Sequence, residues 1–379
     1  MTKKIIIAFI GIIAGIAFGI YFIYFKTEEP LHAKASSKQV IGFLPYWLLN
    51  KTQTDYSNDI TTLTYFGLKV DGNGHIVKLT NPQEEDPGWH ALSSGKLNPF
   101  FTSARENNIK LSLLISSGDV NAINQLLTNP MSHAENLVKD VTPIMKKYHF
   151  SDLNLDIEYT SQASDEAQIH FTQFVKTLKQ LTTKQKLGTL TVEFSPIDVV
   201  THQLINIQTL APYTDTVVLM AYDYHSTVSS VSGPVAPLNG AGKSLEYDVS
   251  SAVAKTLQDI PSQKVVLGVP LYGYGWETLN TAIRSAVIPG SGVLASNNRM
   301  EAFLSSCATC SAFFDTSAEE EYVVYRDQST GTFHQISFPT QQSMKAKVDF
   351  ANKEQLGGLA LWALGYEGNS ILTPLTYYK

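Results

Sequence analysis

The fold of this chain is decided by the stretch FSDLNLDIEY, which covers residues 150–159. Side chains of a β-strand alternate between its two faces, so this stretch predicts a strand with one apolar and one polar face. The apolar face, which we expect to contact helices, consists of Leu153, Leu155 and Ile157. The polar face, which we expect to point toward the axis of a barrel, consists of Asn154, Asp156 and Glu158.

Short runs rich in β-branched residues recur along the chain, and longer amphipathic stretches separate most of them. The predicted strands cover residues 40–44, 61–68, 110–116, 152–157, 189–194, 216–221, 264–269 and 357–362. The helical patterns include residues 134–148, 165–181, 245–260 and 341–355. Eight strands alternating with helices predict an α/β fold, a (β/α)8 TIM barrel over residues 39–379, rather than a six-stranded doubly wound sheet.

The interval between the seventh predicted strand and the next helix is too long for a single crossover. It contains a hairpin pattern, in which residues 322–325 and 333–338 flank a turn at 327–332. The sequence therefore predicts a small α+β insertion at residues 277–338, between strand seven and helix seven.

The N-terminal segment has the pattern of a membrane anchor. Lys3 and Lys4 precede an unbroken apolar run at residues 5–25, which is long enough to span a bilayer as a helix. The two lysines favour a cytoplasmic N-terminus, with the rest of the chain outside. We expect a transmembrane signal anchor at residues 1–27, a linker at 28–38 and an extracytoplasmic barrel. Cleavage at residues 33–35, which would give a secreted protein, is the alternative.

The only two cysteines, Cys307 and Cys310, lie within the predicted insertion. A closely spaced pair in an exported domain favours a small structural disulfide. The pair is too small for a four-ligand zinc site, and no histidine cluster lies beside it. A thioredoxin-like redox site is the alternative, although the flanking sequence lacks the strand-to-helix pattern of such sites.

The overall charge argues against one class of partner. The chain has 28 Lys and Arg against 34 Asp and Glu, a formal net charge of -6. No dense basic run occurs outside the N-terminus, which argues against nucleic acid as the main partner.

Asp156 and Glu158 are candidate catalytic residues on physical grounds. Glu158 falls at the C-terminal end of its strand, where barrel enzymes carry their chemistry. Two inward carboxyls this close repel each other, so one of them holds a proton near neutral pH, as a general acid requires. A structural polar cluster that closes the barrel is the alternative, and it is most plausible for Asn154 alone.

Residues 150–159 resemble the DGxDxDxE signature of glycoside hydrolase family 18. Phe150, Asp156, Glu158 and Tyr159 match it, whereas the departures are Ser151, Asp152 and Asn154. Asn at the middle position also looks like bacterial members that act on peptidoglycan, such as spore-cortex-lytic enzymes. Four further motifs of the family have counterparts, in the same order, at residues 114–118, 220–224, 268–273 and 357–362.

The resemblance implies a retaining glycosidase that hydrolyses β-1,4 bonds in glycans containing N-acetylglucosamine, of the chitin or peptidoglycan type. Catalysis would be substrate-assisted and would need no metal or cofactor. Glu158 would protonate the glycosidic oxygen, Asp156 would orient the 2-acetamido group, and Tyr222 would donate a hydrogen bond to its oxygen. Asn154 would donate a hydrogen bond to Asp156. The implied substrate-binding residues are Asp223, Trp362, Asn154, Met220 and Tyr272.

Two alternatives from other classes stay open. One is a lectin-like barrel without activity, which is suggested by Ser151 in place of the first Asp of the signature. The other is a redox or scaffold protein centred on Cys307 and Cys310. Release of reducing ends from a glycan would exclude the first, and glycan cleavage by a variant without the cysteines would exclude the second.

Overall fold

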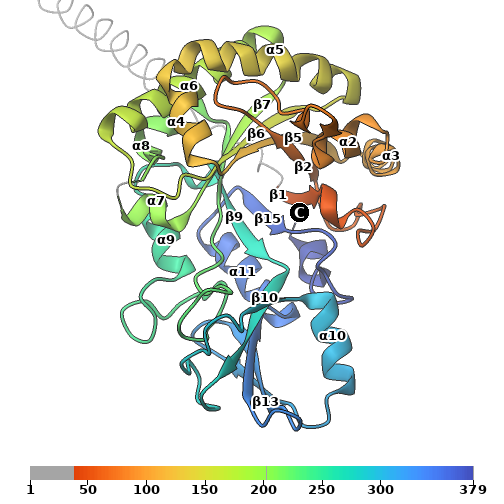
Figure 1. The fold of residues 1–379 in the computed structure, drawn as a ribbon, viewed down its shortest axis with the longest axis vertical. Coiled ribbons are helices and arrows are strands. Elements are labelled where there is room, and N and C mark those ends of the chain that lie inside the picture. Colours follow the sequence, from red (N-terminus) through yellow and green to blue (C-terminus); the bar gives the residue numbers. More distant parts are fainter. Residues whose placement is uncertain (1–37, 202, 379) are drawn as a thin grey trace, which may run out of the picture. The chain divides into compact units, whose positions relative to one another are not determined.

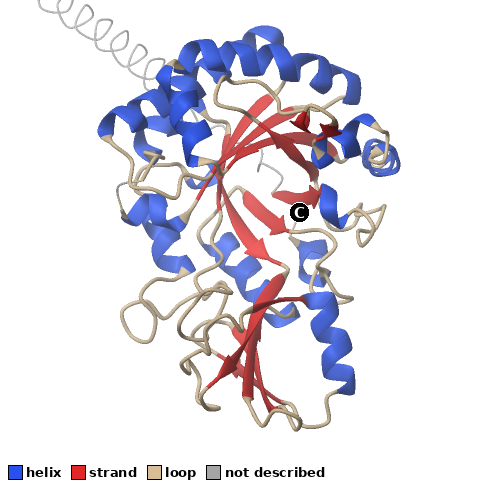
Figure 2. Cartoon of the chain, in the orientation of Figure 1, coloured by secondary structure: helices blue, strands red, loops and turns tan. Residues whose placement is uncertain are grey.

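The predicted strands close into a barrel of eight parallel strands in the computed structural model, which describes residues 38–201 and 203–378 (Figures 1 and 2). Each strand pairs with its neighbours in chain order, and the last pairs with the first. The barrel strands are β1 (Gln39–Pro45), β2 (Thr62–Lys69), β5 (Lys110–Ser117), β6 (Asp152–Ile157), β7 (Thr189–Phe194), β8 (Thr216–Leu219), β9 (Val265–Pro270) and β15 (Gly358–Trp362). The TIM barrel predicted from the sequence is therefore confirmed.

Helices fill the connections between the barrel strands. They are α2 (Pro87–Ser93), α3 (Asn98–Glu106), α4 (Val120–Thr128), α5 (Pro130–Tyr148), α6 (Asp165–Gln185), α7 (Pro196–Val200), α8 (Ile207–Leu210), α9 (Val249–Thr256) and α11 (Gln341–Lys353). The 3-10 turns are η1 (Tyr46–Leu48), η2 (Ala211–Tyr213), η3 (Ser262–Lys264) and η4 (Thr373–Tyr377), and a small hairpin joins β3 (Leu79–Asn81) to β4 (Glu84–Glu85).

Two elements are shorter than the sequence pattern predicts, and local hydrogen bonds explain both. The helix predicted at 245–260 begins only at Val249, because the Asp248 carboxylate accepts the Ser251 backbone N–H and caps the helix there. The strand predicted at 216–221 ends at Leu219, because Ala221 and Tyr222 donate to carbonyls only two residues back. The chain therefore leaves the sheet just where the candidate residues of this strand begin.

The interior of the barrel combines an apolar cluster with polar side chains. The apolar cluster contains Ile41, Phe43, Leu114, Val218, Val266 and Ala360. The polar side chains come mainly from β6 and β7, and Asn154 and Glu193 are at most 3% exposed. Branched apolar residues normally fill such an interior, so buried polar groups here need a structural or chemical reason.

A second sheet follows β9 and precedes α11, and Figure 1 shows it extending away from the barrel. Its order is β11-β10-β14-β13-β12, all antiparallel, and α10 (Asn297–Ser306) packs against it. The strands are β10 (Tyr272–Thr278), β11 (Val293–Ser296), β12 (Ser311–Asp315), β13 (Glu320–Arg326) and β14 (Phe333–Phe338). This insertion module, as we call residues 272–338, contains the predicted hairpin, and its sheet already begins at Tyr272.

Cys307 and Cys310 form a disulfide between the end of α10 and the start of β12. The predicted membrane anchor at residues 1–27 lies outside the described residues, as does the linker up to residue 37. Within residues 38–201 and 203–378, no helix is both long and apolar enough to cross a bilayer.

Candidate active site

The polar face of β6 forms a column that rises through the barrel. At its lower end, the Asp152 carboxylate accepts hydrogen bonds from the hydroxyls of Ser112, Thr189 and Thr191 at 2.6–3.0 Å. These bonds satisfy a carboxylate that is only 9% exposed, so Asp152 closes the barrel as a structural polar group. The structural interpretation considered for this face therefore applies to Asp152, which lies below Asn154 and the candidate catalytic residues.

Asn154 has a different partner from the one predicted. Its side-chain amide donates to Glu193 Oε1 on β7 at 2.8 Å, and no hydrogen bond to Asp156 is present. Residues two apart on one strand are about 6.7 Å apart along it, whereas adjacent strands lie about 4.8 Å apart. The neighbouring strand therefore offers the nearer acceptor, and the predicted Asn154–Asp156 hydrogen bond is wrong.

Asp156 and Glu158 occupy the upper end of the column. Asp156 is 3% exposed and its Oδ1 has no hydrogen-bond partner in the described structure. Burial and the charge of Glu158 both raise the pKa of Asp156 well above its usual value. Glu158 follows directly after β6, where its backbone N–H donates to Ser117 O at 2.9 Å, and its side chain is exposed at the strand end. Its carboxyl end is nevertheless partly enclosed by the residues around it, and this partial burial, together with the charge of Asp223, raises the pKa of Glu158 too.

Tyr222 and Asp223 enter the site from the turn after β8. Burial and then the charge of Glu193 raise the pKa of Tyr222 well above its usual value, so its hydroxyl stays a hydrogen-bond donor. Asp223 has a left-handed backbone with φ +60°. Its Oδ1 accepts hydrogen bonds from Tyr272 at 2.6 Å and Tyr274 at 2.9 Å. Partial burial raises the pKa of Asp223, and the two tyrosine hydrogen bonds oppose that rise.

Aromatic rings form the other wall. Trp362, the last residue of β15, packs edge-on against Phe43, Trp47 and Phe66 at centroid distances of 5.0–6.3 Å. Trp47 is 46% exposed and also lies against Tyr46. The wall therefore presents exposed ring surface opposite the carboxyls, an arrangement that suits the apolar faces of a sugar ring.

These residues line two adjoining cavities at the C-terminal ends of the barrel strands. The larger, of about 380 Å³, is lined by Asp156, Glu158, Glu193, Tyr222, Asp223, Met220 and Trp362, among others. The smaller, of about 290 Å³, is lined by Tyr46, Trp47, Lys69 and Gly118, among others. Both cavities include Phe66, Asp156 and Glu158. Glu158 therefore stands between two spaces, which we call together the catalytic cleft.

Six of the eight predicted catalytic and substrate-binding residues line this cleft, and two do not. Asn154 lies below the cleft, where it donates a hydrogen bond to Glu193. Tyr272 is only 2% exposed, and its hydroxyl donates a hydrogen bond to Asp223. Glu193 also lines the cleft and was not among the predicted site residues. The alternation that placed Asp156 inward would also have placed Glu193 inward, because Leu190, Val192 and Phe194 form the apolar face of β7.

The cleft and its residues can be set against known proteins. Residues 22–367 match the family model described as glycosyl hydrolases family 18. The chain belongs to glycosyl hydrolase family 18. It is therefore a member of a family of glycoside hydrolases, as the motifs around Glu158 indicated.

One family 18 relative is YdhD of Bacillus subtilis (strain 168), which bears the name of a sporulation-specific glycosylase. It is 25% identical over 351 residues, which are 86% of this chain and 73% of that protein. The Ostrinia furnacalis group IV chitinase, solved with allosamidin, has a TM-score of 0.77 at 22% identity and covers 89% of this chain and 98% of that one. The spore cortex-lytic enzyme SleL of Bacillus megaterium has a TM-score of 0.69 at 17% identity and covers 90% and 74%. At these identities the two structures establish a shared family 18 fold.

Glu193 gives a first prediction for this family 18 chain. Burial and the charge of Asp156 raise the pKa of Glu193 well above its usual value, so its contribution to stability is complete at acid pH and is lost as pH rises through that pKa. Glu193→Gln keeps an acceptor for Asn154 but carries no charge. We expect its Tm to exceed that of the wild type by about 2 °C or more at pH 8, and by less at about pH 4.5. Thermal unfolding at both pH values measures this, and an unchanged or lower Tm at pH 8 would contradict it.

Proposed function

We propose that this chain hydrolyses β-1,4 bonds in glycans that contain N-acetylglucosamine, with cell-wall glycan as the first candidate substrate. The observation that carries the proposal is the position of Glu158 between the two cavities, above a buried Asp156 and opposite Trp362. A sugar on each side of Glu158 would place the connecting oxygen within its reach. The names of a chitinase and of a spore cortex-lytic enzyme with the same fold support both glycan types.

The proposed reaction keeps the configuration of the anomeric carbon. Glu158 gives its proton to the glycosidic oxygen as the bond from that oxygen to the anomeric carbon breaks. The carbonyl oxygen of the 2-acetamido group forms a new bond to that carbon, and Asp156 stabilises the positive charge that develops on the ring so formed. Water then opens this ring from the face that the leaving group occupied, and Glu158 takes the proton of the water.

The raised pKa values of Glu158 and Tyr222 support their roles, whereas Asp156, whose pKa is raised too, stabilises the positive charge only in its ionised form. A general acid must be protonated at working pH, and both burial and Asp223 favour the protonated form of Glu158. Tyr222, whose raised pKa keeps its proton in place, would donate to the acetamido oxygen. Trp362 would form the floor under the sugar that reacts.

We further propose that the barrel works outside the cytoplasm. The apolar run at residues 5–25 would anchor it, and the disulfide between Cys307 and Cys310 is of the kind that oxidising compartments favour. Neither cysteine lines the catalytic cleft, so replacing both with Ser should leave glycan cleavage largely intact.

Product analysis tests the proposed activity. The full chain is incubated with chitin oligomers and, separately, with purified peptidoglycan, and the products are identified by mass. We expect fragments whose new reducing end is N-acetylglucosamine, and NMR of the first product should show the β-anomer. Release from peptidoglycan alone, from chitin oligomers alone or from both would define the substrate.

A matched incubation with a Glu158→Gln chain controls for contaminating hydrolases. If the wild-type chain binds both glycans but releases nothing from either, the lectin-like alternative replaces the proposal. If the first product is the α-anomer, hydrolysis stands but the retaining mechanism fails.

A further inference from the structure

The loop that carries Asp223 is held by the insertion module. Trp276 on β10 donates its indole N–H to Ser226 O at 3.0 Å. Farther along the same loop, the backbone N–H groups of Val235 and Ala236 donate to the carboxylate of Glu320 on β13 at 2.9 and 2.7 Å. Ser232 contributes another bond, because its hydroxyl donates to Gln335 on β14 at 2.6 Å. Three strands of the module therefore bind one loop of the barrel.

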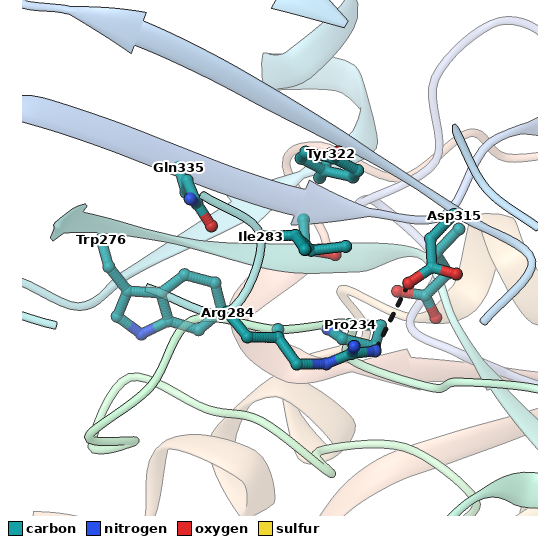
Figure 3. Close-up of a pocket in the computed structure, with 10 residues that line it drawn as sticks. Pro234, Trp276, Ile283, Arg284, Asp315, Tyr322 and Gln335 are labelled. Atoms are coloured by element: carbon teal, nitrogen blue, oxygen red, sulfur yellow. Dashed lines mark hydrogen bonds and ion pairs between the residues drawn. The ribbon is translucent and has the colours of Figure 1, made fainter. Parts of the chain in front are cut away.

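The interface between loop and module is tightly packed. Figure 3 shows its centre, a small cavity lined by Pro234 of the loop and by Trp276, Tyr322 and Gln335 of the module. The Arg284 guanidinium and the Asp315 carboxylate form an ion pair there at 3.4 Å. The cavity that remains there has a volume of about 10 Å³, which is no larger than the space that one water molecule needs. The interface is therefore a rigid support and has no room for a ligand.

One face of β10 points its side chains at the start of this loop. Tyr272, Tyr274 and Trp276 alternate along the strand and so share that face. The two tyrosines donate hydrogen bonds to the same oxygen of Asp223, Oδ1. Trp276 donates to the backbone carbonyl of Ser226, three residues after Asp223. Oδ2 of Asp223 makes no hydrogen bond among the described residues, and Asp223 lines the larger cavity of the catalytic cleft.

Asp223 needs this support for two reasons. Its left-handed backbone is uncommon for a residue other than glycine, so the conformation persists only where surrounding contacts enforce it. Its negative charge, which favours the protonated form of Glu158, must also persist although burial raises the pKa of Asp223, and no lysine or arginine is among the described residues that line this larger cavity. Neutral donors on Oδ1 are therefore the means by which the site stabilises this charge.

We propose that Tyr274 is a positioning residue for the proposed reaction. Its hydroxyl holds the Asp223 carboxylate in place and keeps it ionised, and Tyr274 acts on Glu158 through this carboxylate. The inference rests on the proposed function. Tyr274 is 8% exposed and does not line the catalytic cleft, so it acts through Asp223 and not on the glycan. Strand β10 of the module thereby helps to position Asp223.

Tyr274→Phe isolates the hydroxyl. Phenylalanine keeps the ring packing against Tyr272 and Trp276, at centroid distances of 5.5 and 6.1 Å. We expect kcat to fall by about tenfold, the effect of one hydrogen bond to a charged group. The pKa of Asp223 should rise, since the lost bond stabilised its charged form, so the acid limb of the kcat profile moves to higher pH. The alkaline limb should stay in place, because Asp223 is ionised there in both proteins.

Tyr325→Phe is the matched control, because Tyr325 lies on β13 of the same module and its hydroxyl makes no hydrogen bond within the described residues. Its kcat and pH profile should equal those of the wild type. Tyr274→Arg should move the acid limb to lower pH, since a cation stabilises the Asp223 carboxylate more strongly. A Tyr274→Phe variant with an unchanged acid limb would overturn the proposal, even if its stability fell.

A second readout does not depend on hydrolysis. The ¹³C carboxyl resonance of Asp223, assigned by comparison with Asp223→Asn, is titrated in the full chain and in its Tyr274→Phe variant. A higher pKa in the variant supports the proposal, and an equal pKa overturns it. If the wild type cleaves no glycan, the proposed function fails, whereas this titration still decides what Tyr274 does to Asp223.

Discussion

Glu158→Gln should lower kcat by about 10³- to 10⁴-fold, which is the upper part of the range for loss of a general acid. Glutamine has nearly the same shape as glutamate but has no acidic proton to give to the glycosidic oxygen. The same variant also lacks the base that would activate water, so both steps of the proposed reaction slow down. Glu158 is exposed at the strand end and no side-chain hydrogen bond holds it among the described residues, so the fold should tolerate the change.

The measurement is kcat on a chitin oligomer or peptidoglycan, with glycan affinity determined separately by calorimetry. Affinity should stay within about threefold of the wild type, because the residues that form the walls remain. Glu135→Gln is a suitable control, since Glu135 is an exposed residue of α5 and lines neither cavity of the catalytic cleft. Unchanged turnover in Glu158→Gln would remove Glu158 from the reaction.

The leaving group offers a sharper test of the role of Glu158. A dinitrophenyl glycoside releases an anion that is stable without a proton, so its departure needs little acid catalysis. Glu158→Gln should therefore lose much less activity on this substrate than on a natural glycan. An equal loss on both substrates would mean that Glu158 acts in another way, for example on binding alone.

The barrel could be predicted from the sequence because its signals are local. Each strand carries a β-branched run, and the alternation within residues 150–159 assigns inward and outward faces without knowledge of any neighbour. Strand order also needed no long-range information, since each strand of this fold pairs with the next in the chain. The same local argument predicted that Asp156 and Glu158 lie at the C-terminal end of β6, and both line the catalytic cleft.

Side-chain contacts between neighbouring strands could not be predicted from the sequence. Asn154 pairs in register with Thr191, which brings Glu193 within 2.8 Å of its amide, and a single strand contains no information about that register. The partner of Tyr272 was hidden for a similar reason. The carboxylate that accepts its hydrogen bond, Asp223, is 49 residues earlier in the chain. Asp223 itself has the left-handed backbone of the turn, so no glycine in the sequence indicates this conformation.

Asp156→Asn should change activity and stability in opposite directions. We expect kcat to fall by about 10²- to 10³-fold, because asparagine cannot place a negative charge beside the ring that forms from the acetamido group. We expect stability to rise at neutral and alkaline pH. The raised pKa of Asp156 means that the wild type loses stability as pH rises through it, and the uncharged variant does not.

Asp152→Asn is the matched comparison, since Asp152 lies on the same face of the same strand and is also buried. Burial raises the pKa of Asp152 as well, although the three hydroxyls that donate to its carboxylate oppose that rise. An amide offers those hydroxyls only one acceptor oxygen, so this variant should be less stable than the wild type at about pH 5, and by a smaller margin at about pH 8, where the wild type has lost part of its stability. Its kcat should stay within about threefold of the wild type, because it acts below the site. Thermal unfolding at about pH 5 and pH 8, together with kcat at both, separates the two aspartates. If Asp156→Asn were both active and less stable, Asp156 would be a structural group like Asp152. The unpartnered Oδ1 of Asp156 would then have no role in the reaction.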